Sequence, residues 1–156
     1  MKTNSVLKLN LPEYALKIVP DEETGRRIYD RLRRKWVALT PEEWVRQNFV
    51  EYLINDRDYP AGFMANEVAL RLNGTLRRSD TVVFDRSRRP SVIVEYKAPS
   101  VEITQRVFDQ IVRYNMALQA RYLIVSNGLK HYCCRIDEAV PGGYTFLREV
   151  PHFATL

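Results

Sequence analysis

Three residues that could do metal-assisted chemistry lie in two neighbouring stretches of the chain: Asp80 in the first, and Glu95 and Lys97 in the second. The second stretch begins with a continuous apolar run, which is typical of a strand covered on both faces. An acid or a lysine is rarely buried unless it is paired or bound to something. Two carboxylates can hold a divalent cation, and an amine beside them can stabilise charge on a phosphodiester.

Strand geometry predicts that these side chains converge. Side chains alternate along a strand, so Glu95 and Lys97 share one face, with Cα atoms about 7 Å apart. If the stretch before the turn pairs antiparallel with the second stretch, Asp80 comes near the same end. We therefore expect Asp80 and Glu95 to bind Mg²⁺, with Mn²⁺ as a substitute, and Lys97 to complete the site. Spacing alone equally allows surface ion pairs of these acids with Arg78 and Lys97, each worth ~0–1 kcal/mol.

The order Ser79-Asp80, then Glu95-Tyr96-Lys97, resembles the signature of the PD-(D/E)xK nuclease superfamily, with Ser79 in place of its Pro. More closely, the chain from about Ile28 to Leu147 resembles the N-terminal nuclease domain of type I restriction-enzyme R subunits. The matching stretches are Leu39–Gln47, Arg78–Asp85, Val94–Pro99, Ile103–Gln105 and Tyr122–Leu129.

This resemblance implies a Mg²⁺-dependent endonuclease, related to restriction–modification, that hydrolyses DNA phosphodiester bonds. The expected partners are DNA and either other restriction–modification subunits or a second copy of the chain. The alternative is a non-catalytic DNA-binding or subunit-assembly module on the same scaffold. The R subunits carry helicase domains after this one, so without them we expect the chain to act alone, to join other subunits or to be repurposed.

Supporting roles are open at several positions. The resemblance implies a third acid, for which Glu43 and Glu67 are the candidates, although a Thr-x-x-Glu capping box also explains Glu43. Gln110 and Tyr114, one helical turn apart, resemble the Gln-x-x-x-Tyr motif of RecB-like nucleases, which helps to position the lysine and the DNA strand. They also fit an amphipathic border whose polar tips reach water.

Basic residues flank the candidate site, and the formal net charge is +5. One run spans Gly25 to Lys35. The second group gathers around the central pair of strands, and we expect it to contact DNA phosphates: Arg77, Arg78, Arg86, Arg88 and Arg89. A solvated face that keeps the protein soluble explains such runs equally well.

The composition indicates one globular domain, since 46% of the 156 residues are hydrophobic and 28% are charged. The sequence has neither an apolar run of the roughly 20 residues that a membrane span needs nor a signal peptide, so we expect a cytoplasmic protein. The adjacent Cys133 and Cys134 are expected to pack as small apolar residues.

The elements predict an α/β fold with a restriction-endonuclease-like core, in which helices flank a central mixed sheet of an antiparallel meander plus a parallel strand. Residues 1–39 form an N-terminal extension, 40–127 the core, and 128–156 a C-terminal hairpin. Thr40 caps a helix to about Asn55, and Asn73-Gly74 predicts a hairpin turn. A second helix runs from about Thr104 to Leu118 before a strand at Tyr122–Ser126. Residues 6–19 are expected to be extended, 21–25 a turn, and 26–39 either a short helix or partly extended.

Overall fold

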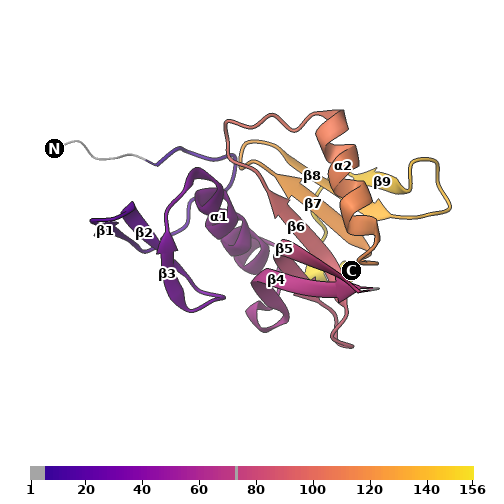
Figure 1. Cartoon of the computed structure of the whole chain (residues 1–156), viewed down its shortest axis with the longest axis horizontal. Helices are drawn as coiled ribbons and strands as arrows, with labels where there is room; N and C mark the ends of the chain where they lie inside the picture. The colour runs from indigo at the N-terminus through magenta and orange to yellow at the C-terminus, as the bar shows by residue number, and fades with distance from the viewer. Residues whose placement is uncertain (1–5, 73) are drawn as a thin grey trace.

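The computed structural model describes residues 6–72 and 74–156, which form a three-stranded sheet, a six-stranded sheet and two α-helices (Figure 1). Neither helix in these ranges has the length and apolar content that a membrane span requires. The mixed sheet with a helix against each face confirms the predicted α/β class.

The first sheet is antiparallel and is built from β1 (Ile18–Asp21), β2 (Gly25–Asp30) and β3 (Lys35–Ala38). The predicted turn between β1 and β2 is confirmed. The helical alternative for residues 26–39 is wrong, because β2 pairs on both sides and leaves Ile28 fully buried between its neighbours. Residues 6–17 lie outside the strands, with a bend at residues 10–11, and only Ile18 and Val19 of the segment 6–19 belong to a strand.

Helix α1 (Pro41–Asp56) starts where the sequence predicts. The Thr40 hydroxyl accepts the Glu43 backbone N–H at 3.0 Å, so the N-cap is confirmed. The Glu43 carboxylate does not complete the capping box. It contacts two arginines instead, which ties the helix to its surroundings.

The second sheet has the strand order β4-β5-β6-β7-β8-β9. Its meander consists of β4 (Met64–Leu72), β5 (Thr75–Phe84) and β6 (Pro90–Tyr96), and a 3₁₀ turn, η1 (Ala61–Phe63), precedes it. The antiparallel pairing of β4 with β5 confirms the hairpin. Of the predicted turn pair, Asn73 lies outside the described residues, and Gly74 has the positive φ of +77° that favours glycine.

The parallel strand is β7 (Tyr122–Ser126), which pairs with β6 after helix α2 (Gln105–Met116), as predicted. The terminal hairpin of β8 (His131–Ile136) and β9 (Tyr144–Leu147) completes the sheet, and a short turn, η2 (Phe153–Thr155), follows. A strand–helix–strand connection gives parallel neighbours because the crossover helix spans the length of the strand.

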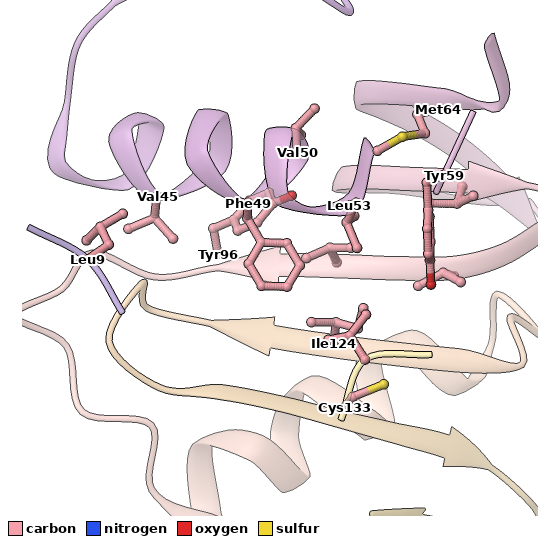
Figure 2. Close-up of a cluster of buried hydrophobic side chains, with 14 residues drawn as sticks. Leu9, Val45, Phe49, Val50, Leu53, Tyr59, Met64, Tyr96, Ile124 and Cys133 are labelled. Atoms are coloured by element: carbon pink, nitrogen blue, oxygen red, sulfur yellow. The ribbon is translucent and has the colours of Figure 1, made fainter. Parts of the chain in front are cut away.

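Each face of the second sheet carries its own core. Val45, Phe49 and Leu53 of α1 point toward Tyr96 and Ile124 (Figure 2). On the other face, α2 packs on the alternate residues of the same strands, including Ile93, Leu123 and Val125. The two cysteines follow this alternation: Cys133 is buried under α1 and Cys134 under α2, which confirms their apolar role. The strand β6 is therefore covered on both faces, as its apolar run predicts.

Candidate active site

Asp80 and Glu95 are neighbours across the β5–β6 pair. The register sets Thr81 opposite Val94, and the next position outward brings Asp80 opposite Glu95. The Asp80 carboxylate accepts the Tyr96 backbone N–H at 2.8 Å. At the point where the β5–β6 ladder ends, a side-chain oxygen therefore serves as the hydrogen-bond acceptor in place of a backbone carbonyl. The Asp80 carboxyl also lies close enough to the Glu95 carboxyl to raise its pKa. The antiparallel pairing that the sequence predicts thus brings both acids together at the end of β6.

The acids share a partly buried environment that disfavours two negative charges. Burial raises the pKa of the Glu95 carboxyl, and the charge and hydrogen bond of Asp80 raise it further. Lys97 and the side-chain amide of Asn115 act in the opposite direction. Since a shared proton relieves the repulsion between two close carboxylates, a cation that replaces the proton would do the same.

In the described part of the chain, ordinary ion pairs do not occupy Asp80 and Glu95. Among residues 6–72 and 74–156, no arginine or lysine forms an ion pair with Asp80 or Glu95. Arg78 pairs with Glu67 at 3.2 Å instead. Lys97 follows the end of β6, where its backbone N–H donates to the Ser126 carbonyl at 2.9 Å. Its charge acts on Glu95 without a direct pair.

The donor set suits a hard divalent cation. In the part of the chain that the structure describes, no three or more His, Cys, Asp or Glu side chains are gathered so that together they could hold a metal ion. Two neighbouring carboxylates remain, and Mg²⁺ is commonly held by one or two carboxylates together with water and substrate phosphate. The residues therefore fit Mg²⁺ better than a metal that needs a complete protein cage, such as structural zinc.

Both candidates for the third acid are held by arginines. Glu43 is buried and lies 2.7 Å from Arg33 and 2.8 Å from Arg46. Glu67 lies 2.6 Å from Arg46 and 3.2 Å from Arg78. An acid that already neutralises two guanidinium groups is poorly placed to bind a cation as well.

The sequence reasoning missed Glu42, which lies in the first turn of α1. Partial burial of its carboxyl and the charge of Asp80 raise the pKa of Glu42, although the residue as a whole stays exposed. Lys97 acts on the same carboxyl in the opposite direction. The charges of Asp80 and Lys97 therefore act on Glu42, whereas the next residue, Glu43, pairs with Arg33 and Arg46.

Glu67 breaks the regular alternation of β4 across from Asp80. Its backbone φ is +56°, an uncommon value for a residue other than glycine. Asn66 bonds to Asp30 and Thr81 near α1, whereas Val68 packs in the core under α2. Residues two apart should share a face of a strand. The side chains before and after Glu67 therefore face opposite sides of the sheet, and this change occurs beside the candidate site. Backbone outliers of this kind are frequent at functional sites.

Helix α2 contributes a further residue to the candidate site. Asn115 is buried, its side-chain amide donates to the Ile111 carbonyl at 2.9 Å, and the same side chain lowers the pKa of Glu95. Gln110 and Tyr114 are both exposed, and Arg77 stacks 4.0 Å from the centroid of the Tyr114 ring. The amide at the candidate site thus comes from the residue after the Gln-x-x-x-Tyr pair. An asparagine among apolar helix positions is the signal that could have revealed it.

The basic residues divide into separate groups. Arg77 and Arg78 lie on β5 near the candidate site, while Arg86, Arg88 and Arg89 lie in the turn at the opposite end of β5 and β6. Several arginines of the run from Gly25 to Lys35 are engaged in ion pairs: Arg27 with Asp21, Arg31 with Glu51, and Arg33 with Asp30 and Glu43. That run is therefore less available to DNA than its composition suggests.

The family model described as type I restriction enzyme R protein N terminus matches residues 41–151. These residues run from the start of α1 to beyond β9, so the match includes Asp80, Glu95 and Lys97. A search of curated proteins finds no significant match.

Proposed function

Because the chain belongs to the family of type I restriction enzyme R protein N-terminal domains, we propose that it is a Mg²⁺-dependent endonuclease domain that hydrolyses DNA phosphodiester bonds. Asp80 and Glu95 hold the cation, and Lys97 stabilises negative charge on the scissile phosphate. A bound Mg²⁺ supplies polarisation of the phosphate and lowers the pKa of the attacking water. DNA and other restriction–modification subunits are the proposed partners.

The observation that carries this proposal is the Asp80–Glu95 pair itself. The two acids lie opposite each other across β5 and β6, and no described cation is paired with either of them. A pair of neighbouring carboxyls costs free energy in the absence of a counter-ion, because burial and mutual repulsion both disfavour ionisation. Such a cost is common at sites that bind a metal or carry out acid–base chemistry, and it has no evident benefit for folding.

The roles of the remaining residues follow from their positions. Asn115 orients the Glu95 carboxyl, and the Tyr96 backbone N–H orients that of Asp80. Neither donor neutralises the site, so the negative charge stays available to a cation. Arg77 and Arg78 lie on the strand that carries Asp80 and are suited to contact the phosphates next to the scissile one.

The test is cleavage of supercoiled plasmid by purified protein with Mg²⁺ or Mn²⁺. We expect nicking by the parent and a loss on the order of 100-fold or more in Glu95→Ala and Lys97→Ala. Glu138→Ala is the matched control, since Glu138 is an exposed acid between β8 and β9. Equal nicking by all variants would reveal a contaminating nuclease and leave a DNA-binding or assembly module as the function.

Calorimetric titration with Mn²⁺ tests the metal site without relying on turnover. Asp80→Asn keeps a side chain that can accept the Tyr96 N–H but removes one negative charge. We expect the parent to bind Mn²⁺ and this variant to lose most of that affinity. Unchanged Mn²⁺ affinity in Asp80→Asn would remove Asp80 from the metal site.

A further inference from the structure

The strand β9 is an open edge of the second sheet, because it pairs with β8 on one side only (Figure 1). Its four residues are partly or largely exposed and include neither a charged residue nor a proline. Natural sheets usually protect such an edge with charges, proline or a bulge, because unpaired backbone groups attract another strand. The opposite edge, β4, has this protection, since it carries Arg71 and the positive φ of Glu67. The unprotected edge is therefore β9.

The hydrogen-bond pattern determines which backbone groups of β9 point outward. Asp137 donates its backbone N–H to the Gly143 carbonyl at 2.8 Å, so these two residues form a hydrogen-bonded pair. Hydrogen-bonded and non-hydrogen-bonded pairs alternate along an antiparallel ladder. Thr145 therefore directs its backbone groups toward β8, whereas Tyr144 and Phe146 direct theirs toward the open edge. Among residues 6–72 and 74–156, no loop, turn or side chain accepts either of these outward N–H groups.

A second copy of the same strand matches this edge in register and in side chains. A two-fold axis through Thr145 places Tyr144 of one copy opposite Phe146 of the other, and each such pair can form two backbone hydrogen bonds. Both side chains lie on the α2 side of the sheet, where their ring centroids are 5.3 and 4.9 Å from that of Phe108. Phe146 is 46% exposed, and Tyr144 of the second copy would cover it. The aromatic cluster would thus continue across the axis.

The charges beside β9 favour a second copy over an unrelated strand. In the same register, Arg148 of one copy comes beside Gly142 of the other. Gly142 lines a hollow of about 450 Å³ together with Asp109 and Arg113. The two hydrogen bonds that Asp109 accepts both go to Oδ1, so its Oδ2 can still accept from a guanidinium.

Arg148 is exposed and suited to fill this hollow of the second copy. Within the described ranges, it forms no ion pair of its own. Arg113 acts on Asp109 from a distance, and no ion pair joins the two in the same ranges. We propose that two copies of the chain associate through β9, antiparallel about a two-fold axis at Thr145, so that their second sheets become one continuous sheet.

This proposal goes beyond the endonuclease function and does not depend on it. β9 is three strands away from β6, which corresponds to roughly 14 Å in the direction of the ladder hydrogen bonds. The carboxylates of the candidate active site therefore take no part in the association. Glu95→Ala should dimerise like the parent, so a failure of either proposal leaves the other standing.

Sedimentation velocity of the full chain, from micromolar to millimolar concentration, measures the association. We expect a monomer–dimer equilibrium in the parent. Phe146→Lys sets a charge against Tyr144 of the second copy and should weaken dimerisation about tenfold, since the symmetry applies each loss twice. Leu76→Lys is the matched control, because Leu76 is 60% exposed and lies on β5, away from this edge. It should leave the equilibrium unchanged.

The ion pair across the axis has its own pair of variants. Arg148→Ala should weaken dimerisation, because it removes the partner proposed for Asp109. Arg86→Ala is the control, since Arg86 is equally an exposed arginine but lies in the turn between β5 and β6. Both variants lower the net charge by one, so a difference between them reports the contact rather than the overall charge.

A cysteine on the axis tests the register directly. The two copies of Thr145 would form a non-hydrogen-bonded pair with Cα atoms about 4.5 Å apart, which a disulfide can bridge. Thr145→Cys should therefore form a covalent dimer under mild oxidation, seen by non-reducing gel electrophoresis. Leu76→Cys, equally exposed to oxidant, should remain largely monomeric. The native Cys133 and Cys134 are buried and should not compete.

Three results would overturn the proposal. The first is a parent that remains monomeric over the whole concentration range. The second is equal cross-linking of Thr145→Cys and Leu76→Cys, which would mean random collision. The third is equal weakening by Phe146→Lys and Leu76→Lys, because the effect would then be general charge repulsion. Circular dichroism of each variant shows whether the fold is kept, and the exposed Thr145→Cys decides the matter if Phe146→Lys does not fold.

Discussion

The Arg46 guanidinium supports the backbone of Asp80 from the α1 side of the sheet, donating to the Asp80 carbonyl at 3.0 Å. The same guanidinium contacts Glu43 at 2.8 Å and Glu67 at 2.6 Å, and its residue is 5% exposed. Arg46 thus fixes the strand position that carries one of the two site carboxylates. It is a positioning residue and contributes no ligand to the site.

Replacing Arg46 by Ala should destabilise the protein strongly. Glu43 and Glu67 would lose a buried counter-charge, and breaking a buried pair from one side typically costs about 3–5 kcal/mol. Chemical denaturation at neutral pH measures the difference. Arg31→Ala is the control, because Arg31 pairs with Glu51 at 3.1 Å but keeps 44% of its side chain exposed. Its loss should be within about 1 kcal/mol. Similar losses in both variants would contradict the role given to Arg46.

The network around Arg46 shows where sequence reasoning reaches its limit. The N-cap of α1 and the β4–β5 hairpin depend on neighbouring residues, so local patterns predict them. The buried Asp30, which accepts a hydrogen bond from Asn66, joins the first sheet to β4 across more than thirty positions. A contact of that kind leaves no local signal. The sequence leaves residues 26–39 open between helix and strand for the same reason, since only pairing with β1 and β3 defines β2.

The candidate site likewise has some features that local patterns in the sequence predict and others that they do not. Alternation and antiparallel pairing predict that Asp80, Glu95 and Lys97 converge, because strand period and register are simple geometry. The choice between Glu42 and Glu43 depends on the rotation of α1 over the sheet, which no local pattern in the sequence sets. A rotation by one residue exchanges an acid near Asp80 for an acid bound to Arg33 and Arg46.

Glu95 should make the metal-free protein less stable as the pH rises. Its pKa is raised in the folded state, so the native protein holds a proton that the unfolded chain releases above about pH 4.5. Stability is therefore fully present below that value and is lost as the pH rises through the folded pKa. Glu95→Gln should abolish this loss. Thermal unfolding of both proteins in the presence of a chelator, across pH 5 to 9, measures the difference.

Subtracting the two pH profiles removes a competing effect. Burial lowers the pKa of His131, so its contribution runs in the opposite direction and is lost as the pH falls below about 6.5. His131 is present in both proteins and cancels in the difference. Parallel profiles for the parent and Glu95→Gln would show that the carboxyl pair holds no proton in the folded state.

Cys133 and Cys134 should resist thiol reagents in the folded protein. Burial raises the pKa of both thiols to about 12, and only the thiolate is reactive. Labelling with an aromatic disulfide reagent should therefore be slow in buffer and complete in denaturant. Cys134→Val should be tolerated within about 1.5 kcal/mol, since the core accepts apolar residues of similar volume. Fast labelling of the native protein would mean that the sheet opens at β8.

Asn115 should tune the metal site from helix α2. Its side chain lowers the pKa of Glu95 and so favours the ionised carboxyl, and Asn115→Leu should therefore raise that pKa further. Mn²⁺ binding requires that carboxyl to be deprotonated, so its affinity should recover only at higher pH than in the parent. Calorimetric titration at several pH values gives the midpoint for each protein. Gln110→Leu is the control, because Gln110 is exposed on the same helix. A shifted midpoint in Gln110→Leu with none in Asn115→Leu would assign the supporting role to the Gln-x-x-x-Tyr pair instead.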